Sequence, residues 1–384
     1  MVNGEEFPKR VRVLILGGGI HGSGVAHDLA TRGWRDVHLL DRMDFDQIPE
    51  SHWPVLLGEK FIQSQNFRGI GLLSAELAEQ DFLCQRAPDI VTTREFVLPL
   101  TGSTVAERFM IKSRLVLASM MSNHSNLCAY RKIASAGSGD ILPTQTHKGV
   151  GTNYAVTQVV TQYAALVQRV ANSARMLGVT TSTGAEVLQL ESTTDGWNIS
   201  VRTPSNKICK ISALYVVNCL GPWANALLER SGLLPTHQGI CTRVTTLSVR
   251  GVDYAQSVFM PAICDRRRPL FLMPWQNKLI FGSHESHYVG DFDTSHHSDE
   301  DVDALIQAHN HCFEDKMSRD NVVQIGTSFK WSSFTSTDNR TETNATQLIG
   351  ERSSGRGLLF TVYNNDMIKY LSLIHISEPT RPER

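Results

Sequence analysis

Three glycines near the start of the chain have the spacing that binds the phosphates of a nucleotide. They are Gly17, Gly19 and Gly22, within the run Gly-Gly-Gly-Ile-His-Gly at residues 17–22. In such a motif the first glycine permits a tight turn, the second lets the backbone approach a pyrophosphate, and the third lets a helix pack closely on a strand. Asp41 lies nineteen positions after Gly22, where a carboxylate can accept hydrogen bonds from an adenosine ribose. These residues predict a site for an adenine dinucleotide.

The elements that must position these residues follow one another in the required order. Residues 11–16 predict a strand, residues 20–32 a helix, and residues 37–40 a second strand that ends on Asp41. The helix would point its free N–H groups and the positive end of its dipole at the phosphates. The alternative is a glycine-rich turn that binds no ligand. Strand, glycines, helix, strand and acid in register favour the binding site, and with it a redox enzyme.

The bulk composition is that of an ordinary globular protein and excludes several functions. The 384 residues, 41% hydrophobic and 20% charged, are enough for two domains or one large two-part enzyme. A net charge of −1 gives no global field that favours nucleic acid, so we expect no nucleic-acid partner. We predict no transmembrane segment, because no apolar stretch has the necessary length, and residues 1–10 lack a signal-peptide core.

The seven cysteines favour a reducing compartment. Their number is odd and none of them forms a Cys-x-x-Cys pair. This usage predicts reduced, mostly buried thiols and a cytoplasmic protein.

The last residues of the chain have a different origin from the rest, according to their sequence. Residues 371–381 read Leu-Ser-Leu-Ile-His-Ile-Ser-Glu-Pro-Thr-Arg, which is one reading frame of a common sequencing-library adapter. We therefore predict that residues 371–384 are an artefact and that the natural sequence stops near Tyr370. The alternative is a genuine polar tail. Residues 371–384 are therefore not part of the predicted fold, as an expression tag would not be.

The order of elements along the chain indicates the fold class. A long helix is predicted over residues 157–177, and short strands with a hairpin turn at Asp195-Gly196 follow it. A buried strand at residues 214–220 ends in Gly-Pro-Trp, and an antiparallel block occupies residues 243–283. The expected fold is α/β, with a Rossmann-like three-layer FAD/NAD(P)-binding domain and an inserted antiparallel β-rich substrate domain.

Several segments make a family resemblance specific. They are the glycine motif at 17–26, Val-Asn-Cys-Leu-Gly-Pro-Trp at 217–223, Phe-Leu-Met-Pro-Trp at 271–275 and Met-Ser-Arg-Asp at 317–320. With them the chain resembles the FAD-dependent glycerol-3-phosphate dehydrogenases, within the D-amino-acid-oxidase-like flavoproteins. The resemblance implies FAD as cofactor and a small-molecule substrate, with hydride transfer from a secondary alcohol to flavin N5. It also implies electron transfer to a quinone, at the inner face of a membrane to which the protein is peripheral.

The resemblance assigns residues and boundaries to this chain. It places Val187 where a backbone meets adenine and Gly221 at the end of a return strand. The candidate cofactor-binding residues are Gly17, Gly18, Gly19, Ile20, His21, Gly22, Asp41, Arg42, Val187 and Gly221. The expected parts are an FAD-binding domain in two pieces (1–100 and 151–235), an irregular and helical insertion (101–150), a β-rich substrate domain (236–345) and an FAD-binding return segment (346–370).

The substrate residues depart from the family pattern. Residues 51–60 contain no His-Gly-Gly-x-Arg-Tyr segment, and Leu247 stands at the place of a histidine near the flavin. Lys330 takes the place of an arginine, and Asp366 stands where a phosphate-binding lysine would be. Lys330 is the candidate for holding an anionic substrate, and an acid at Asp366 would repel a phosphate.

Two histidines are further catalytic candidates. His284 and His287 could serve as general base for alcohol oxidation, because imidazole titrates near working pH. The run His-Glu-Ser-His at 284–287 also suggests a metal site. We expect none, because zinc-protease histidines lie four apart on a helix and these lie three apart in a strand pattern.

Two other classes of function stay open at this point. The same fold could bind NAD in place of FAD. The lost substrate residues could instead mark a non-catalytic flavoprotein, or one whose substrate has changed to an amino acid or hydroxy acid.

Overall fold

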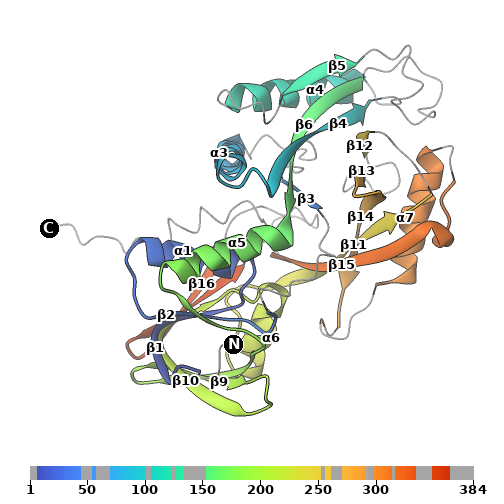
Figure 1. Cartoon of the computed structure of the whole chain (residues 1–384). Helices are drawn as coiled ribbons and strands as arrows, with labels where there is room; N and C mark the ends of the chain where they lie inside the picture. Colours follow the sequence, from blue (N-terminus) through green and yellow to red (C-terminus); the bar gives the residue numbers. More distant parts are fainter. Residues whose placement is uncertain are drawn as a thin grey trace.

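The structure is a computed structural model in which two sheets lie side by side (Figure 1). It describes residues 7–44, 54–57, 70–100, 105–122, 127, 129–133, 153–251, 256–260, 270–290, 292, 297–313, 316–333 and 348–363. The terminal segment attributed to an adapter, and Asp366, lie outside the described residues. No helix in the described part has the length and apolar character needed to cross a membrane.

The first sheet has eight strands and carries the glycine motif. Its main path is β16-β17-β10-β1-β2-β7, in which β17, β10, β1, β2 and β7 run parallel. The strands are β1 (Arg10–Leu16), β2 (Val37–Leu40), β7 (Thr180–Ser182), β8 (Glu186–Thr193), β9 (Gly196–Arg202), β10 (Ile208–Asn218), β16 (Leu348–Ser354) and β17 (Gly357–Tyr363). This arrangement confirms the predicted α/β class with a Rossmann-like domain.

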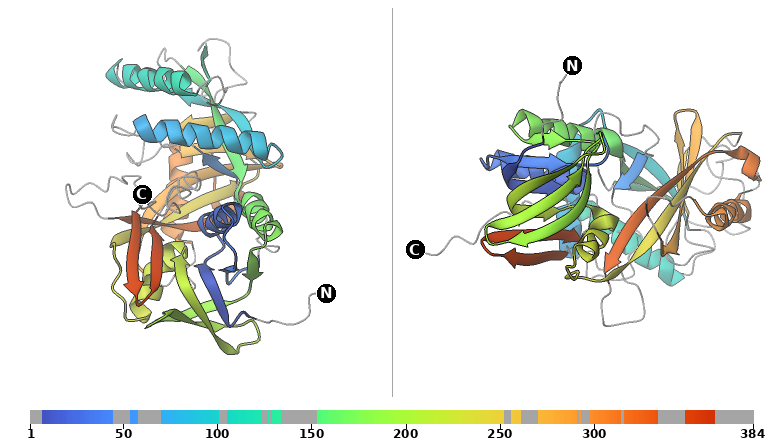
Figure 2. Two further views of the ribbon diagram at one scale, coloured as in Figure 1. Left: turned by 90° about the vertical axis from the view of Figure 1, so that its left-hand side faces the viewer. Right: turned by 90° about the horizontal axis from the view of Figure 1, so that it is seen from below.

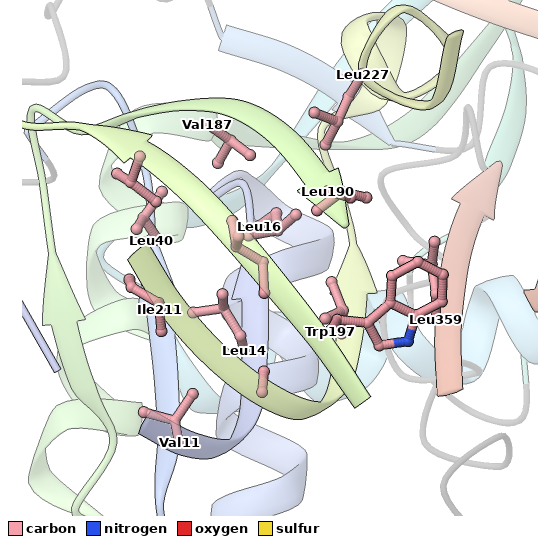
Figure 3. Close-up of a cluster of buried hydrophobic side chains, with 14 of the residues drawn as sticks. Val11, Leu14, Leu16, Leu40, Val187, Leu190, Trp197, Ile211, Leu227 and Leu359 are labelled. Atoms are coloured by element: carbon pink, nitrogen blue, oxygen red, sulfur yellow. The ribbon is translucent and has the colours of Figure 1, made fainter. Parts of the chain in front are cut away.

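Both faces of this sheet are covered, which explains the apolar run at β1. Val13 and Ile15 face the helices α1 (Ile20–Thr31) and α5 (Tyr163–Met176), which pack on each other. Leu14 and Leu16 belong to a second core on the other face, formed with β8, β9 and α6 (Ala224–Arg230); Figure 3 shows this core. The run Val13–Leu16 is buried on both sides and is therefore apolar at each position, whereas Arg10 and Arg12 at the start of β1 are exposed.

The second sheet has nine strands in the order β15-β11-β14-β13-β12-β4-β6-β3, with β5 paired to β6. Its strands are β3 (Pro54–Leu57), β4 (Val91–Pro99), β5 (Tyr130–Ile133), β6 (Asn153–Gln162), β11 (Gly239–Val249), β12 (Ser257–Met260), β13 (Leu270–Trp275), β14 (Lys278–Tyr288) and β15 (Val322–Ser333). All its pairings are antiparallel except β12 with β4. The sheet has the predicted β-rich, antiparallel character.

Helices cover the second sheet from different sides. The helix α7 (Asp299–Cys312) packs on β14 and β11, on the side away from the first sheet (Figure 2). The helices α3 (Ile70–Arg86) and α4 (Val105–Met121) contact each other near β4 and β6. The predicted hairpin with its turn at Asp195-Gly196 is present, between β8 and β9.

The predicted helix over residues 157–177 is wrong in its first part. Residues 157–162 are the end of β6, and α5 begins only at Tyr163. Val159 and Val160 are buried, and the strand pairs with β4 along its whole length. β-branched residues favour a strand when a neighbour is present to pair with, and that neighbour is distant in sequence.

The order of the strands along the chain does not show which of the two sheets each strand belongs to. The strands β3, β4, β5 and β6 all belong to the second sheet, although they precede α5. β3 follows β2 along the chain, yet it pairs with β6 of the second sheet. The domain boundaries given above stay a prediction.

His38 is a buried histidine in β2, and it links the stability of the fold to pH. Its Nδ1 lies 2.8 Å from the Thr180 hydroxyl on β7, and its Nε2 is buried without a partner among the described residues. Burial lowers the pKa of His38 to about 4. The unfolded chain therefore binds a proton between about pH 6.5 and pH 4 that the folded protein does not bind.

We expect the free energy of unfolding to fall as the pH falls through this window, by up to about 3 kcal/mol at pH 4. Full stability from this group is present above its unfolded pKa. In a His38→Val variant, which leaves the Thr180 hydroxyl bonded to the Val37 carbonyl, this part of the pH dependence should disappear. Urea unfolding at a series of pH values measures it, with the exposed His311→Val as control. Equal pH profiles for wild type and His38→Val would show that His38 is not the group responsible.

Candidate active site

Two glycines of the motif are required by the packing of the first sheet. Gly17 has φ +94°, and a Cβ there would lie 2.6 Å from the carbonyl oxygen of Cys219. A Cβ on Gly22 would overlap the carbonyl oxygen of Gly17. The turn after β1 and the start of α1 therefore approach too closely for any side chain at these two positions.

Gly19 has a different reason to be a glycine. It is the N-cap of α1 with ordinary extended backbone, and no side chain caps the helix there. Among the described residues, a Cβ on Gly19 would meet the Tyr163 hydroxyl alone within 4 Å, at 3.8 Å. The fold itself does not exclude a side chain at Gly19, so this position is free to admit the close approach of a ligand.

The N-terminus of α1 supplies hydrogen-bond donors beside Gly19. The first N–H groups of a helix have no partner within the helix, and the helix dipole makes this end positive. Ile20 and His21 form the first turn, which contains no acidic residue. The Ser23 hydroxyl donates a hydrogen bond to the Gly18 carbonyl oxygen at 2.8 Å, which stabilises the glycine turn between β1 and α1. This end of the helix is suited to a phosphate group.

Asp41 is held rigidly at the end of β2. Its carboxylate accepts hydrogen bonds from the N–H of Gly18 at 2.5 Å and of Met43 at 2.6 Å. Its backbone bonds to Ser182 and Ala185 beside β7. Burial raises the pKa of Asp41, although these two N–H donors and the nearby arginine oppose the rise. The carboxylate therefore stands beside the glycine turn, as a ribose-binding acid must.

The other predicted cofactor residues lie around the same edge of the sheet. Val187 is buried beside Leu40 in the core of Figure 3, and its carbonyl accepts a hydrogen bond from Arg230 at 2.8 Å. Gly221, with φ +56°, begins the short helix η4 (Gly221–Trp223) after β10. The guanidinium of Arg42 lies 4.4 Å from the ring centre of Trp223.

A chain of aromatic contacts connects this edge to the second sheet. The Trp223 ring lies 5.6 Å from Phe292, and Phe292 lies 5.2 Å from Phe329 on β15. Phe329 is the neighbour of Lys330. In a strand, consecutive side chains point to opposite faces, so Phe329 lies on the face of Arg243, which Asp301 of α7 contacts, and Lys330 lies on the other face. The rings therefore connect the strand end that carries Gly221 to β15, and not to the Lys330 side chain.

Lys330 and His287 share one face of the second sheet. In the register of β14, β11 and β15, Thr242 is opposite His287 on one side and Lys330 on the other. Directly opposed residues point to the same face. Glu285, two positions before His287, belongs to that face too, and its carboxylate lies 3.6 Å from Lys330 Nζ. The Lys330 side chain is 13% exposed, so the charge is largely shielded from water.

His284 lies on the opposite face, beneath α7. There Asp301 of α7 accepts hydrogen bonds from Arg243 at 2.8 Å, Thr245 at 3.0 Å and Ser286 at 3.1 Å. His284 Nε2 lies 3.7 Å from the same carboxylate. This cluster attaches α7 to the sheet, and it separates His284 from His287 and Lys330.

Leu247 is also on the face beneath α7. It is fully buried in the core that Val302 and Leu305 of α7 complete. The neighbouring positions on the other face of β11 are Thr246 and Ser248. A leucine at this point serves packing and presents no polar group to a substrate.

The residues around Gly19 fit an adenine dinucleotide. They combine an open glycine position, a helix N-terminus, two close-packed glycines and a buried carboxylate. A family model described as FAD-dependent oxidoreductase matches residues 12–364. The chain belongs to this family. The predictions of an FAD-dependent oxidoreductase fold and of FAD as the cofactor are confirmed.

Curated relatives of this FAD-dependent oxidoreductase are named as dehydrogenases and as oxidases. The chain is 24% identical over 321 residues to D-erythritol 1-phosphate dehydrogenase of Brucella abortus, which covers 82% of this chain and 62% of the relative. It is 26% identical over 316 residues to glycerol-3-phosphate dehydrogenase of Pseudomonas tolaasii, covering 81% and 59%. The chain spans about three fifths of the length of these relatives.

Solved structures share the fold of this oxidoreductase. A glycerol-3-phosphate dehydrogenase from Bacillus halodurans, complexed with FAD, superposes with TM-score 0.67 at 19% identity, over 96% of this chain and 64% of that one. A glycine oxidase from Geobacillus kaustophilus gives the same TM-score and identity over 97% and 96%.

Two residues near the site were missed by the sequence reasoning. Tyr163 lies beside Gly19, and no periodic pattern marks it because it stands where β6 ends and α5 begins. In the sequence, Glu285 stands out only because it lies between His284 and His287. Its contact with Lys330 depends on the register of three strands. Among the described residues no group of three or more His, Cys, Asp or Glu side chains could hold a metal ion.

Proposed function

We propose that this protein oxidises a small secondary alcohol carrying an anionic group, of the glycerol-3-phosphate class. The observation that carries the proposal is the shielded Lys330, on the face of the second sheet without α7. The phosphorylated substrates in the names of both curated relatives support it. FAD, when bound, supplies the acceptor for the hydrogen and electron pair of the C–H bond.

The chain's own residues supply binding and proton transfer. Lys330 attracts the anionic group, and the low exposure of its side chain strengthens that attraction relative to a surface lysine. His287, aligned with Lys330 across Thr242, accepts the hydroxyl proton on a neutral ring nitrogen. Glu285 competes with the anionic group for Lys330 and repels it, so it weakens the binding of this group. His284 takes no part, because it lies beneath α7.

Anaerobic reduction of the bound flavin tests the proposal. We expect glycerol 3-phosphate or erythritol phosphate to bleach the flavin spectrum, and unphosphorylated glycerol to leave it unchanged. A protein that binds NAD and fails to bind FAD, or a loaded flavoprotein that no member of the panel reduces, would contradict it.

A second candidate is the oxidation of an α-amino acid, and Glu285 is the observation that favours it. An acid 3.6 Å from Lys330 offers opposite charges to the two ends of a zwitterion. The glycine oxidase with the same fold gives this candidate a structural precedent, though only for the fold. Flavin reduction by glycine or alanine, with no response to the phosphates, would support it over the first.

We further propose a quinone as electron acceptor, on the resemblance to the glycerol-3-phosphate dehydrogenases. Reoxidation of the reduced protein by a water-soluble quinone analogue should be at least about tenfold faster than by oxygen. Faster reoxidation by oxygen would instead make the protein an oxidase.

A further inference from the structure

The phenol of Tyr163 lies at the N-terminus of α1. Its hydroxyl oxygen is 3.5 Å from the backbone nitrogen of Ile20, which donates to it. Apart from the adjacent backbone, the same oxygen is the one atom of the described residues that lies within 4 Å of the position that a Cβ on Gly19 would take. Tyr163 therefore contributes a polar atom to the place where backbone and ligand approach most closely.

The ring of Tyr163 is held in place by apolar packing. It packs against the core formed by Ile20, Leu166, Val167 and others between α1 and α5. Because a tyrosine has only two rotatable side-chain bonds, this packing fixes where the hydroxyl points. Burial raises the pKa of Tyr163, and so does the charge of Asp41, so the hydroxyl keeps its proton and can donate.

In the contact with Ile20 the hydroxyl oxygen of Tyr163 is the acceptor, so this contact does not use the hydroxyl proton. A distance of 3.5 Å is long for an N–H···O bond, so the N–H of Ile20 is only weakly satisfied by it. The hydroxyl and this N–H are two donors side by side at the positive end of a helix. Such a pair suits two oxygens of one phosphate group.

We propose that Tyr163 is a cofactor-binding residue, whose hydroxyl donates a hydrogen bond to the pyrophosphate of FAD beside the first N–H groups of α1. The inference requires FAD binding and is independent of the substrate. Tyr163 is also the first residue of α5, directly after β6 of the second sheet. The contact would therefore attach the pyrophosphate to the crossover between the two sheets.

The test compares Tyr163→Phe with a matched control, Tyr215→Phe. Tyr215 lies on β10, where its ring packs edge-on against Trp34 on the helix side of the sheet. After removal of the flavin, quenching of FAD fluorescence gives the dissociation constant. We expect Tyr163→Phe to bind FAD about tenfold more weakly than wild type, which corresponds to about 1.4 kcal/mol. Tyr215→Phe should bind with the affinity of wild type.

Binding of ADP and of adenosine shows whether the loss of affinity arises at the phosphates and whether the variant is folded. We expect Tyr163→Phe to bind ADP about tenfold more weakly and adenosine as wild type does, since only ADP carries a pyrophosphate. Equal loss for adenosine would place the defect outside the phosphate contact and overturn the proposal. Unchanged or tighter binding of FAD by Tyr163→Phe would overturn it too, because the hydroxyl would then be neutral or a competitor.

Discussion

A Gly19→Val variant is expected to fold as the wild type does and to lose FAD. In the part of the chain that the structure describes, a Cβ at Gly19 meets the Tyr163 hydroxyl alone, at an ordinary contact distance of 3.8 Å, so we expect the protein without cofactor to accommodate a side chain there. The valine methyl groups would then occupy the space through which the pyrophosphate approaches the backbone. We expect the affinity for FAD to fall by at least about a thousandfold, or about 4 kcal/mol. Flavin fluorescence quenching and the absorbance of the purified protein measure it.

Gly22→Ala is the contrasting variant. Its Cβ would overlap the Gly17 carbonyl oxygen, so we expect loss of stability in the protein without FAD, by about 3 kcal/mol or more. Thermal unfolding of both flavin-free variants separates the two roles. Retention of FAD by Gly19→Val would refute the assignment of this turn as the phosphate site. A stable Gly22→Ala would show that the close approach of α1 and β1 is not obligatory.

A Lys330→Gln variant is expected to keep its flavin and lose its substrate. Lys330 is the shielded cation on the face of the second sheet opposite α7, and glutamine removes the charge while keeping much of the side chain. We expect kcat/KM for a phosphorylated alcohol to fall by about a thousandfold, mainly through KM. The exposed Lys207→Gln should behave as wild type. A Lys330→Gln enzyme with unchanged KM would remove Lys330 from the site.

Glu285→Gln distinguishes the two candidate substrates. The glutamine removes a negative charge that lies 3.6 Å from Lys330 Nζ. For a phosphorylated alcohol, KM should fall by about threefold to tenfold, because the competing anion is gone. For an amino acid, KM should rise by a similar factor, since the ammonium group loses its partner. Steady-state kinetics with both substrate classes on one preparation give the sign.

The local unit that carries the proposed nucleotide site, and FAD as the cofactor, could be predicted from the sequence. Gly17, Gly22 and Asp41 belong to a strand, a turn and a helix that are consecutive in the chain. Their chemistry depends on contacts between neighbouring elements, such as the bond from Gly18 to Asp41. The predicted strands and the helix from residue 20 are present within a residue or two.

The substrate side could not be predicted in this way. His284 and His287 are three positions apart in sequence, yet the alternation of a strand sends them to opposite faces, and only α7 decides which face is covered. Lys330, Glu285 and Thr242 meet through the register of three strands separated by more than forty residues each.

The sequence by itself determined that this chain binds a dinucleotide, because residues of one local unit form the glycine turn, the N-terminus of α1 and the position of Asp41. Only the tertiary structure decided that residues 157–162 are a strand, because β4 is there to pair with them. It also decided that Tyr163 reaches the first turn of α1, 143 positions earlier in the chain. Contacts of that range leave no periodic trace in a single sequence, since they arise from the packing of whole sheets and helices.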